Sequence, residues 1–218
     1  MSLESYFCLI VFLSSIPIIS LFIRLICILP FTKISKSIND SKKSIKPFKG
    51  SKISIFLGSG GHTGEMLKLI SKLDISDLKT TWIYSSGDLS SINQIKQHNQ
   101  NAHLIEIPRA RKVGQSYLTS IPTTLYSFLI SSITLLNHNP KILLLNGPGT
   151  CIPIAYILFF YKIFGLNNTK VIYIESLARV NKLSLSGRLI MPIADRFIVQ
   201  WENLYHQYNR AEYYGILL

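Results

Sequence analysis

Short apolar runs alternate with longer helical patterns over most of the chain. Apolar runs of five or six residues, rich in β-branched side chains, predict strands over residues 52–57, 80–85, 103–107, 141–146, 170–174 and 196–200. The stretches between them predict helices near 62–73, 89–98, 118–137, 150–164, 183–191 and 202–210. Buried strands that alternate with helices are typical of a parallel sheet covered on both faces. We therefore predict one doubly wound α/β domain over residues 52–218, with the order of its strands left open.

The first thirty residues have a different pattern, a nearly continuous apolar stretch. Tyr6 to Ile23 contains 18 residues and no charge, so as a helix it would be roughly 27 Å long and would match the thin bilayer of the endoplasmic reticulum. Arg24 and a second apolar run follow, and the arginine could extend its head group to the interface. A cleaved signal peptide would start with positive charge, whereas this start carries Glu4. We predict a retained transmembrane anchor over residues 6–31, with a cleaved signal or a buried core helix as the alternatives.

Charge changes the picture mainly through its position. The chain has 23 basic and 11 acidic residues, a net charge of +12, and seven of the lysines lie between residues 32 and 52 beside a single acid, Asp40. This concentration argues against a nucleic-acid-binding domain and predicts a solvated basic linker over residues 32–51, whose lysines would be attracted to an anionic leaflet. Because positive charge follows the anchor, we expect residues 1–5 on the lumenal side and residues 52–218 in the cytosol.

Composition limits the remaining possibilities. An apolar content of 48% and a charged content of 16% allow a substantial core. The three cysteines, Cys8, Cys27 and Cys151, have neither disulfide nor metal-ligand spacing. We therefore expect no disulfide framework, no metal site and no cofactor.

Residues 113–140 form an uncharged stretch with helical periodicity. One face of the predicted helix carries apolar side chains and the other carries hydroxyl groups: Ile121, Leu125, Leu129 and Ile133 against Ser127, Ser131 and Thr134. We favour a helix packed into the core through its apolar face. Because its polar face carries no charge, shallow contact with lipid or with a lipid substrate is the alternative.

The segment after the first predicted strand is the strongest candidate for chemistry. It reads GSGGHTG over residues 58–64, and ligands bind at the carboxyl ends of strands in such sheets. Glycines let the backbone approach a ligand, and the following helix offers unpaired amides to an anion. The Gly-Lys-Ser/Thr ending of a nucleotide phosphate loop is absent, and Thr63 replaces the third glycine of the dinucleotide fingerprint. His62 could donate a hydrogen bond to a phosphate or act as a base, or it could simply cap the helix.

Three more segments follow predicted strands and would lie at the same edge of the sheet. They are RARK over residues 109–112, NGPGT over 146–150 and ESLAR over 175–179. Together with the glycine-rich loop they suggest a site for an anionic ligand with hydroxyl groups, such as a sugar phosphate. The sequence lacks a serine-hydrolase elbow and an aspartate pair suited to metal-dependent sugar transfer.

Several of these motifs, taken in order, resemble a known family. GSGGHTGEM, PRARKVGQS, NGPGTCIP, YIES, LSLSG, ADRFIVQW and AEYYG are similar to the membrane subunit of the two-chain UDP-N-acetylglucosamine transferase of the dolichol pathway. The similarity runs from about Lys52 to Leu218, behind the same kind of amino-terminal anchor. The glycine-rich loop alone would also fit the related bacterial peptidoglycan transferase.

The resemblance implies one lobe of an inverting, two-lobed GT-B glycosyltransferase that is divided between two chains. This chain would bind dolichyl-diphosphate N-acetylglucosamine (GlcNAc) at the cytosolic face of the endoplasmic reticulum membrane, which continues into the nuclear envelope. It would recruit a soluble catalytic subunit that binds UDP-GlcNAc, and the pair would add the second GlcNAc during protein N-glycosylation. Since about 167 residues make only one lobe, we expect the chain to be inactive alone.

The resemblance also implies roles for individual residues. His62 would help to deprotonate the accepting hydroxyl. The acceptor and its diphosphate would contact Ser59, Gly60, Gly61, His62, Thr63, Gly64, Asn146, Gly147, Pro148, Gly149, Thr150, Glu175, Ser176 and Arg179, with further phosphate contacts from Arg109 and Arg111. The partner would dock on the carboxyl-terminal tail: Tyr213, Tyr214, Gly215, Ile216, Leu217 and Leu218.

Two other interpretations fit the pattern less well. An anchored NAD(P)-dependent oxidoreductase would use the glycine-rich loop for its nucleotide and Asp88 for a ribose. Thr63 and the absence of a Tyr-x-x-x-Lys pair argue against it. A pure scaffold with a degenerate site would keep the tail and have no use for His62.

Overall fold

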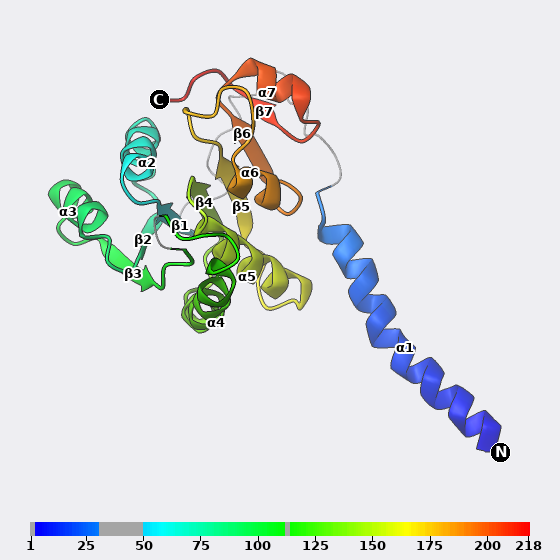
Figure 1. Cartoon of the computed structure of the whole chain (residues 1–218). Coiled ribbons are helices and arrows are strands. Elements are labelled where there is room, and N and C mark those ends of the chain that lie inside the picture. The colour runs from blue at the N-terminus through cyan, green and yellow to red at the C-terminus, as the bar shows by residue number, and fades with distance from the viewer. Residues whose placement is uncertain (1–2, 31–49, 112–113) are drawn as a thin grey trace.

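A seven-stranded parallel sheet forms the centre of the protein (Figure 1). We describe it from a computed structural model, in which residues 3–30, 50–111 and 114–218 are placed. The strands are β1 (Lys52–Leu57), β2 (Lys79–Ser85), β3 (His103–Ile107), β4 (Ile142–Asn146), β5 (Lys170–Ile174), β6 (Arg196–Val199) and β7 (Glu212–Tyr213). Their order is β3-β2-β1-β4-β5-β6-β7, and every neighbouring pair is parallel. The predicted doubly wound class is confirmed.

All six predicted strands are present, with bounds within one residue of the prediction. The seventh strand, β7, was not predicted. It contains only two residues and pairs with β6 through Ile198 and Val199. So short a strand leaves no period-2 pattern in a sequence.

Helices cover both faces of the sheet. α2 (Gly61–Ser71) and α3 (Leu89–His98) pack on one face, where they bury Met66, Leu69 and Ile95 against strand residues such as Ile55 and Leu144. The other face carries α4 (Ser120–His138), α5 (Cys151–Ile163), α6 (Leu185–Ile190) and α7 (Glu202–Gln207).

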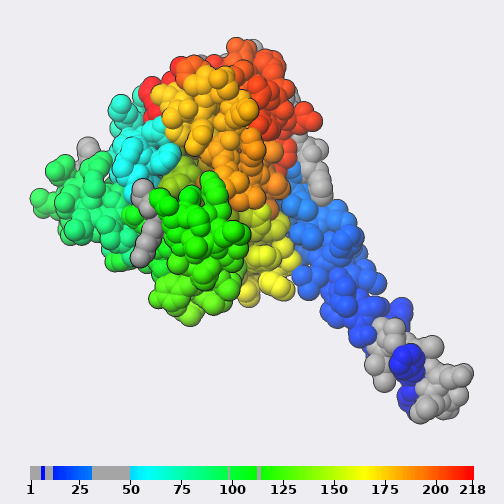
Figure 2. Space-filling view, in the orientation of Figure 1, coloured from blue at the N-terminus to red at the C-terminus, as the bar shows by residue number. Residues whose placement is uncertain are grey.

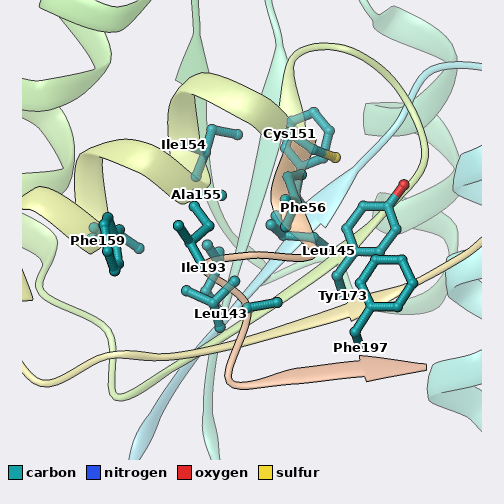
Figure 3. Close-up of a cluster of buried hydrophobic side chains, with 14 of the residues drawn as sticks. Phe56, Leu143, Leu145, Cys151, Ile154, Ala155, Phe159, Tyr173, Ile193 and Phe197 are labelled. Carbon is teal, nitrogen blue, oxygen red and sulfur yellow. The ribbon is translucent and has the colours of Figure 1, made fainter. Parts of the chain in front are cut away.

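The larger core lies under this second group of helices (Figure 3). Ile154, Ala155 and Phe159 of α5 face the strands, and the rings of Tyr173 and Phe197 stack with centroids 5.2 Å apart. Successive strand side chains point to opposite faces, so each strand supplies both cores. The strands therefore read as continuous apolar runs.

The strand order places a switch point between β1 and β4. The chain runs outward from β1 to β3 at one edge, then returns to β4 and runs outward to the other edge. The connections after β1 and β4 therefore leave the sheet in opposite directions, and a crevice forms at their carboxyl ends. This is the position of the glycine-rich loop and the segment after Asn146.

A long helix, α1 (Leu3–Ile28), projects away from the domain (Figure 1). Its carboxyl-terminal end contacts α5, where Arg24 Nε donates a hydrogen bond of 3.2 Å to the carbonyl oxygen of Lys162. Large apolar side chains are exposed along it: Tyr6, Phe7, Phe12, Leu13, Ile16, Ile18, Ile19, Leu21, Phe22, Ile23 and Ile26. Within the placed ranges, no helix has the length and hydropathy that a membrane crossing requires. The anchor over 6–31 stays a prediction, and residues 31–49 of the predicted linker lie outside the described residues.

The predicted orientation of the uncharged helix is wrong. Ser127 and Ser131 of α4 are fully buried, while the apolar residues expected in the core are exposed: Ile121, Leu125, Leu129 and Ile133. Ser127 Oγ donates a hydrogen bond of 2.6 Å to the carbonyl oxygen of Pro108, and Tyr161 of α5 donates one of 2.6 Å to the carbonyl of Ser132. Small inward side chains let α4 lie close to its neighbours. The bond to Pro108 satisfies the buried hydroxyl of Ser127, whereas Ser131 Oγ has no hydrogen-bond partner among the described residues.

Candidate functional site

A pocket of about 250 Å³ lies at the carboxyl ends of the central strands. Its walls come from α2, from the segments after β3, β4 and β5, and from the starts of α4 and α6. Figure 2 shows α2 (cyan), the start of α4 (green) and the segment after β5 (gold) meeting around this position. Among the predicted residues, the pocket is lined by His62, Arg111, Gly147, Pro148, Gly149, Glu175, Ser176 and Arg179.

The amino end of α2 opens toward this crevice without a capping side chain among the described residues. Gly60 precedes the helix with a φ of 65°, a left-handed conformation that favours glycine. A Cβ atom at Gly60 or Gly61 would meet nothing within 4 Å, so packing inside the chain does not require these glycines. The first-turn amides and the open space above them suit an anionic ligand.

His62 is the central side chain of the pocket. Its Nδ1 lies 3.1 Å from Asn146 Oδ1 and 3.5 Å from Glu65 Oε2. The ring packs on the backbone at Gly147, where a Cβ atom would lie 2.5 Å from His62 Cγ. These contacts bring the glycine-rich loop and the NGPGT segment together, as the sequence predicted. They also hold the imidazole, since its Nδ1 edge is enclosed on three sides.

Glu65 is a site residue that the sequence reasoning missed. Its Oε1 accepts hydrogen bonds from Ser176 Oγ at 2.9 Å and from the Leu177 amide at 3.2 Å. It therefore connects α2 to the segment after β5. The available signal was its position three residues after His62, which places both side chains on one face of a helix.

Glu175 is fully buried and organises the segment after β5. Its carboxylate accepts hydrogen bonds from the Ser176 amide at 3.1 Å, the Ser184 amide at 3.0 Å and Ser184 Oγ at 3.1 Å. Burial raises the pKa of the Glu175 carboxyl, and the hydrogen bonds from Ser184 and Ser176 oppose this shift. Since Ser184 also caps α6, Glu175 fixes the loop that forms one wall of the pocket.

Two predicted contact residues have side chains turned into the protein. Thr63 is fully buried, and its hydroxyl contacts the carbonyl of Gly58 and Ser91 Oγ. Asn146 is also fully buried behind His62. A ligand could therefore reach only the main chain of Thr63, and Asn146 acts on the pocket through His62. Gly64 lies within α2, where a Cβ atom would also meet open space.

A second, adjacent hollow holds three further predicted residues, Ser59, Arg109 and Thr150. It is lined by Ser59, Ser85, Arg109, Arg111, Gly114, Pro148, Gly149 and Thr150. Arg111 borders both hollows, and its guanidinium lies 4.3 Å from the centre of the Tyr117 ring. The two arginines thus stand beside the glycines of the crevice, and their role as phosphate contacts stays a prediction.

Asp88 does not have the role that the oxidoreductase interpretation needs. Its carboxylate is buried at the start of α3 and accepts hydrogen bonds from the Ser91 amide at 3.2 Å and from Ser91 Oγ at 2.6 Å. It is a helix cap. Over the described residues there is also no cluster of three or more His, Cys, Asp or Glu side chains placed to hold a metal ion.

The predicted docking tail is largely part of the domain. Tyr213 belongs to β7, and Leu217 and Leu218 pack against the core beside α2. Tyr214 accepts a hydrogen bond of 2.6 Å from Arg196 and donates one of 2.7 Å to Glu212. Ile216 differs, since its side chain is 53% exposed.

Comparison with known families settles the relationship. The family model described as "Oligosaccharide biosynthesis protein Alg14 like" matches residues 53–217, which include all of the sheet except Lys52 and the residues that line both hollows. The chain belongs to the Alg14 family. This confirms the resemblance drawn from the motifs.

Relatives of this Alg14 family chain agree with the assignment. It is 55% identical over 222 residues to the protein named UDP-N-acetylglucosamine transferase subunit ALG14 of Candida albicans, and the match covers 100% of both chains. It is 35% identical over 184 residues to the mouse protein of the same name, covering 78% of this chain and 85% of that one.

Solved structures show the fold. MurG of Acinetobacter baumannii superposes with a TM-score of 0.51 at 14% identity, over 70% of this chain and 42% of that chain. The Alg14 family chain therefore spans less than half the length of that structure. At this identity the likeness shows a shared architecture and nothing about substrate.

Proposed function

We propose that the chain is the acceptor-binding subunit of a heteromeric UDP-GlcNAc transferase that adds the second GlcNAc to dolichyl-diphosphate GlcNAc in protein N-glycosylation. The observation that carries the proposal is the full-length match to the UDP-N-acetylglucosamine transferase subunit ALG14 of Candida albicans. The pocket supports it, because open helix amides, arginines and a histidine suit a diphosphate that carries a sugar.

In this proposal a separate soluble subunit binds UDP-GlcNAc and closes the crevice from the other side. The reaction inverts the anomeric centre. The proton of the acceptor hydroxyl passes to His62 Nε2 while the hydroxyl oxygen bonds to the anomeric carbon of the donor sugar. The bond from that carbon to the UDP oxygen breaks, and its electron pair leaves on the diphosphate.

The chain's own groups have distinct tasks in this step. The amides at Gly61 and His62, with Arg111 and Arg179, hold the acceptor diphosphate. Such positioning supplies much of the rate acceleration in transfer between two bound substrates. No metal or cofactor enters the scheme.

The proposal includes membrane anchoring at the endoplasmic reticulum, with the first residues in the lumen and the domain in the cytosol. The exposed apolar side chains of α1 and of the outer face of α4 support contact with lipid. The acceptor pattern Asn167-Asn168-Thr169 gives a simple check in cells. Glycosidase treatment should leave the mass of the chain unchanged, and a shift at Asn167 would contradict the cytosolic placement.

The function is tested by transfer of labelled GlcNAc from UDP-GlcNAc to dolichyl-diphosphate GlcNAc. The purified chain, its candidate soluble partner and the two together are assayed side by side. We expect product only from the mixture. Product from the chain alone would contradict a divided site, and silence of the mixture would reject the proposed reaction.

The scaffold alternative makes a different prediction in the same assay. If the chain only recruits its partner, His62→Ala leaves transfer intact. We expect His62→Ala to lower kcat about 100-fold or more while the complex still forms. Co-purification of the two chains separates loss of chemistry from loss of assembly.

A further inference from the structure

Glu65 contacts His62 and the segment after β5 at the same time. One carboxylate oxygen, Oε1, is held by Ser176 Oγ at 2.9 Å and by the Leu177 amide at 3.2 Å. The other, Oε2, is buried, has no hydrogen-bond partner among the described residues, and lies 3.5 Å from His62 Nδ1. The carboxylate is therefore fixed at one end and faces the imidazole at the other.

The surroundings of Nδ1 determine which tautomer His62 adopts. Nδ1 has two oxygen neighbours, Glu65 Oε2 and Asn146 Oδ1 at 3.1 Å. The Asn146 amide could turn over and present its nitrogen, but an ionised carboxylate accepts hydrogen bonds and never donates them. Glu65 therefore favours a proton on Nδ1 in the neutral ring.

The opposite nitrogen is left free. The Nδ1 edge of the ring packs on Gly147, and Nε2 has no hydrogen-bond partner among the described residues. His62 lines the acceptor pocket, and its side chain is 34% exposed. With the proton on Nδ1, the lone pair of Nε2 is available to a ligand hydroxyl.

We propose that Glu65 is a positioning residue that holds His62 in the Nδ1–H tautomer and leaves Nε2 unprotonated toward the acceptor. Its catalytic meaning rests on the proposed transferase function. A carboxylate behind a histidine base both orients the ring and stabilises the imidazolium that forms during proton transfer. Because Ser176 and Leu177 hold the same carboxylate, the orientation of His62 also depends on the wall of the pocket after β5.

Other charged groups border the same ring and must be kept constant in a test. Glu175 and Arg179 follow β5, and Arg111 follows β3; all three line the pocket with His62. Glu65→Gln changes only the nearest carboxylate and keeps its shape. The matched control is Glu202→Gln on α7, an exposed glutamate whose carboxylate lies 3.8 Å from His206 Nε2.

The first experiment reads the tautomer directly and needs no activity. The full chain is labelled with ¹⁵N-histidine, and the His62 signals are assigned by their loss in His62→Gln. We expect the Nδ1–H tautomer in the wild type and in Glu202→Gln, and a mixture of tautomers in Glu65→Gln. An Nε2–H tautomer in the wild type, or no change in Glu65→Gln, would overturn the proposal.

The second experiment measures transfer by the two-chain complex. We expect Glu65→Gln to lower kcat about 10- to 100-fold, with the acceptor KM within about twofold of wild type. The acid limb of the pH profile should move to lower pH, because a neutral amide no longer stabilises the imidazolium. Glu65→Asp, which keeps the charge, should recover part of the rate. Wild-type kcat and an unmoved pH profile in Glu65→Gln would reject the positioning role.

The two readouts separate this inference from the proposed function. If the wild-type complex transfers no GlcNAc, the function is wrong, and the tautomer measurement still decides the role of Glu65. If transfer occurs but Glu65→Gln leaves the tautomer and the rate unchanged, only the inference about Glu65 fails. Circular dichroism of each variant confirms that the fold is intact before either result is interpreted.

Discussion

At Gly147 the backbone itself forms the wall behind the imidazole of His62. The residue has a φ of 96°, and a Cβ atom there would lie 2.5 Å from Cγ and 2.8 Å from Cε1 of His62. Real Cβ contacts do not approach so closely, so any side chain at this position must displace the ring. A displacement of about 1 Å at a reacting group can cost about 100-fold in rate.

We therefore predict that Gly147→Ala lowers kcat for transfer by about 100-fold, with a smaller loss of stability from its left-handed backbone. Gly50→Ala is the control, since Gly50 has a φ of 73° and a Cβ atom there meets nothing within 4 Å. Both variants add one methyl group at a left-handed glycine. Steady-state kinetics should show the loss only in Gly147→Ala; equal rates in the two variants would mean that the ring of His62 tolerates displacement.

The carboxylate of Asp195 binds three donor groups near the start of β5. It accepts hydrogen bonds from Lys162 at 2.9 Å, Lys170 at 3.0 Å and the Val171 amide at 3.0 Å. Burial alone would raise the pKa of the Asp195 carboxyl, but the contacts with Lys162, Val171 and Lys170 outweigh it and lower the pKa. A lowered native pKa contributes stability above the unfolded pKa, near 3.9, and this stability is lost as the pH falls through the native value.

We predict that Asp195→Asn destabilises the chain by about 3–5 kcal/mol at pH 7, because the buried ammonium of Lys162 loses its opposite charge. The difference from wild type should shrink as the pH falls below about 4 and through the lowered native pKa of Asp195, where the wild-type carboxylate is protonated. Urea unfolding at pH 7 and pH 3 measures both terms. The exposed Asp74→Asn should change the unfolding free energy little at either pH, and a constant difference for Asp195→Asn across pH would contradict the linkage.

Individual site residues were only partly predictable. Glycines, His62 and Arg111 were recognisable because their chemistry is visible in the sequence at the ends of strands. The burial of Thr63 was not, since it depends on its contact with Ser91 of another helix. The role of Glu65 likewise follows from contacts with Ser176, 111 residues away.

At the scale of elements, the strands were predicted well because each is buried on both faces and reads as a continuous apolar run. α4 was placed correctly along the chain but with its faces reversed. Periodicity defines two faces of a helix and does not say which one is buried when neither carries charge. Here the hydroxyl face turns inward, because Ser127 binds the Pro108 carbonyl and small side chains allow close packing.

Mutations can separate the packing of the carboxyl-terminal tail from its proposed role in docking the partner. We predict that Leu217→Ala lowers the unfolding free energy by about 2 kcal/mol, because Leu217 packs on the core beside α2. Ile216→Ser should leave the melting temperature unchanged, since Ile216 is exposed, but should weaken binding of the partner. Thermal unfolding and co-purification measure the two effects. Full partner binding by Ile216→Ser would remove this residue from the interface.

At the scale of the molecule, the alternation of strands and helices predicted the fold class, and the structure adds the strand order. That order brings the segments after β1, β4 and β5 to one crevice, although they are separated by many residues. The arrangement of α1 relative to the domain could not be predicted, because its hydrogen bond to the domain runs from Arg24 to a main-chain carbonyl, a group that every residue carries.

We predict that Arg24→Ala loosens α1 without unfolding the domain, because Leu25, Ile28 and Leu29 still contact the core. Hydrogen exchange should rise at the amides of residues 26–29 and at Gly165, whose Cβ position would lie 3.2 Å from the Arg24 guanidinium, with an unchanged melting temperature. Arg188→Ala, on the exposed side of α6, is the control. No change in exchange for Arg24→Ala would show that the apolar contacts alone hold α1.

The position of α5 between α1 and the pocket has a geometric consequence. Its carboxyl end meets Arg24, and its amino end follows Gly149 and Thr150 directly. A helix of 13 residues is about 20 Å long and resists compression. α5 therefore keeps a constant distance between the pocket and the carboxyl-terminal end of α1. If α1 lies in a membrane and the pocket binds the proposed acceptor, the acceptor sugar must reach this distance from the lipid surface.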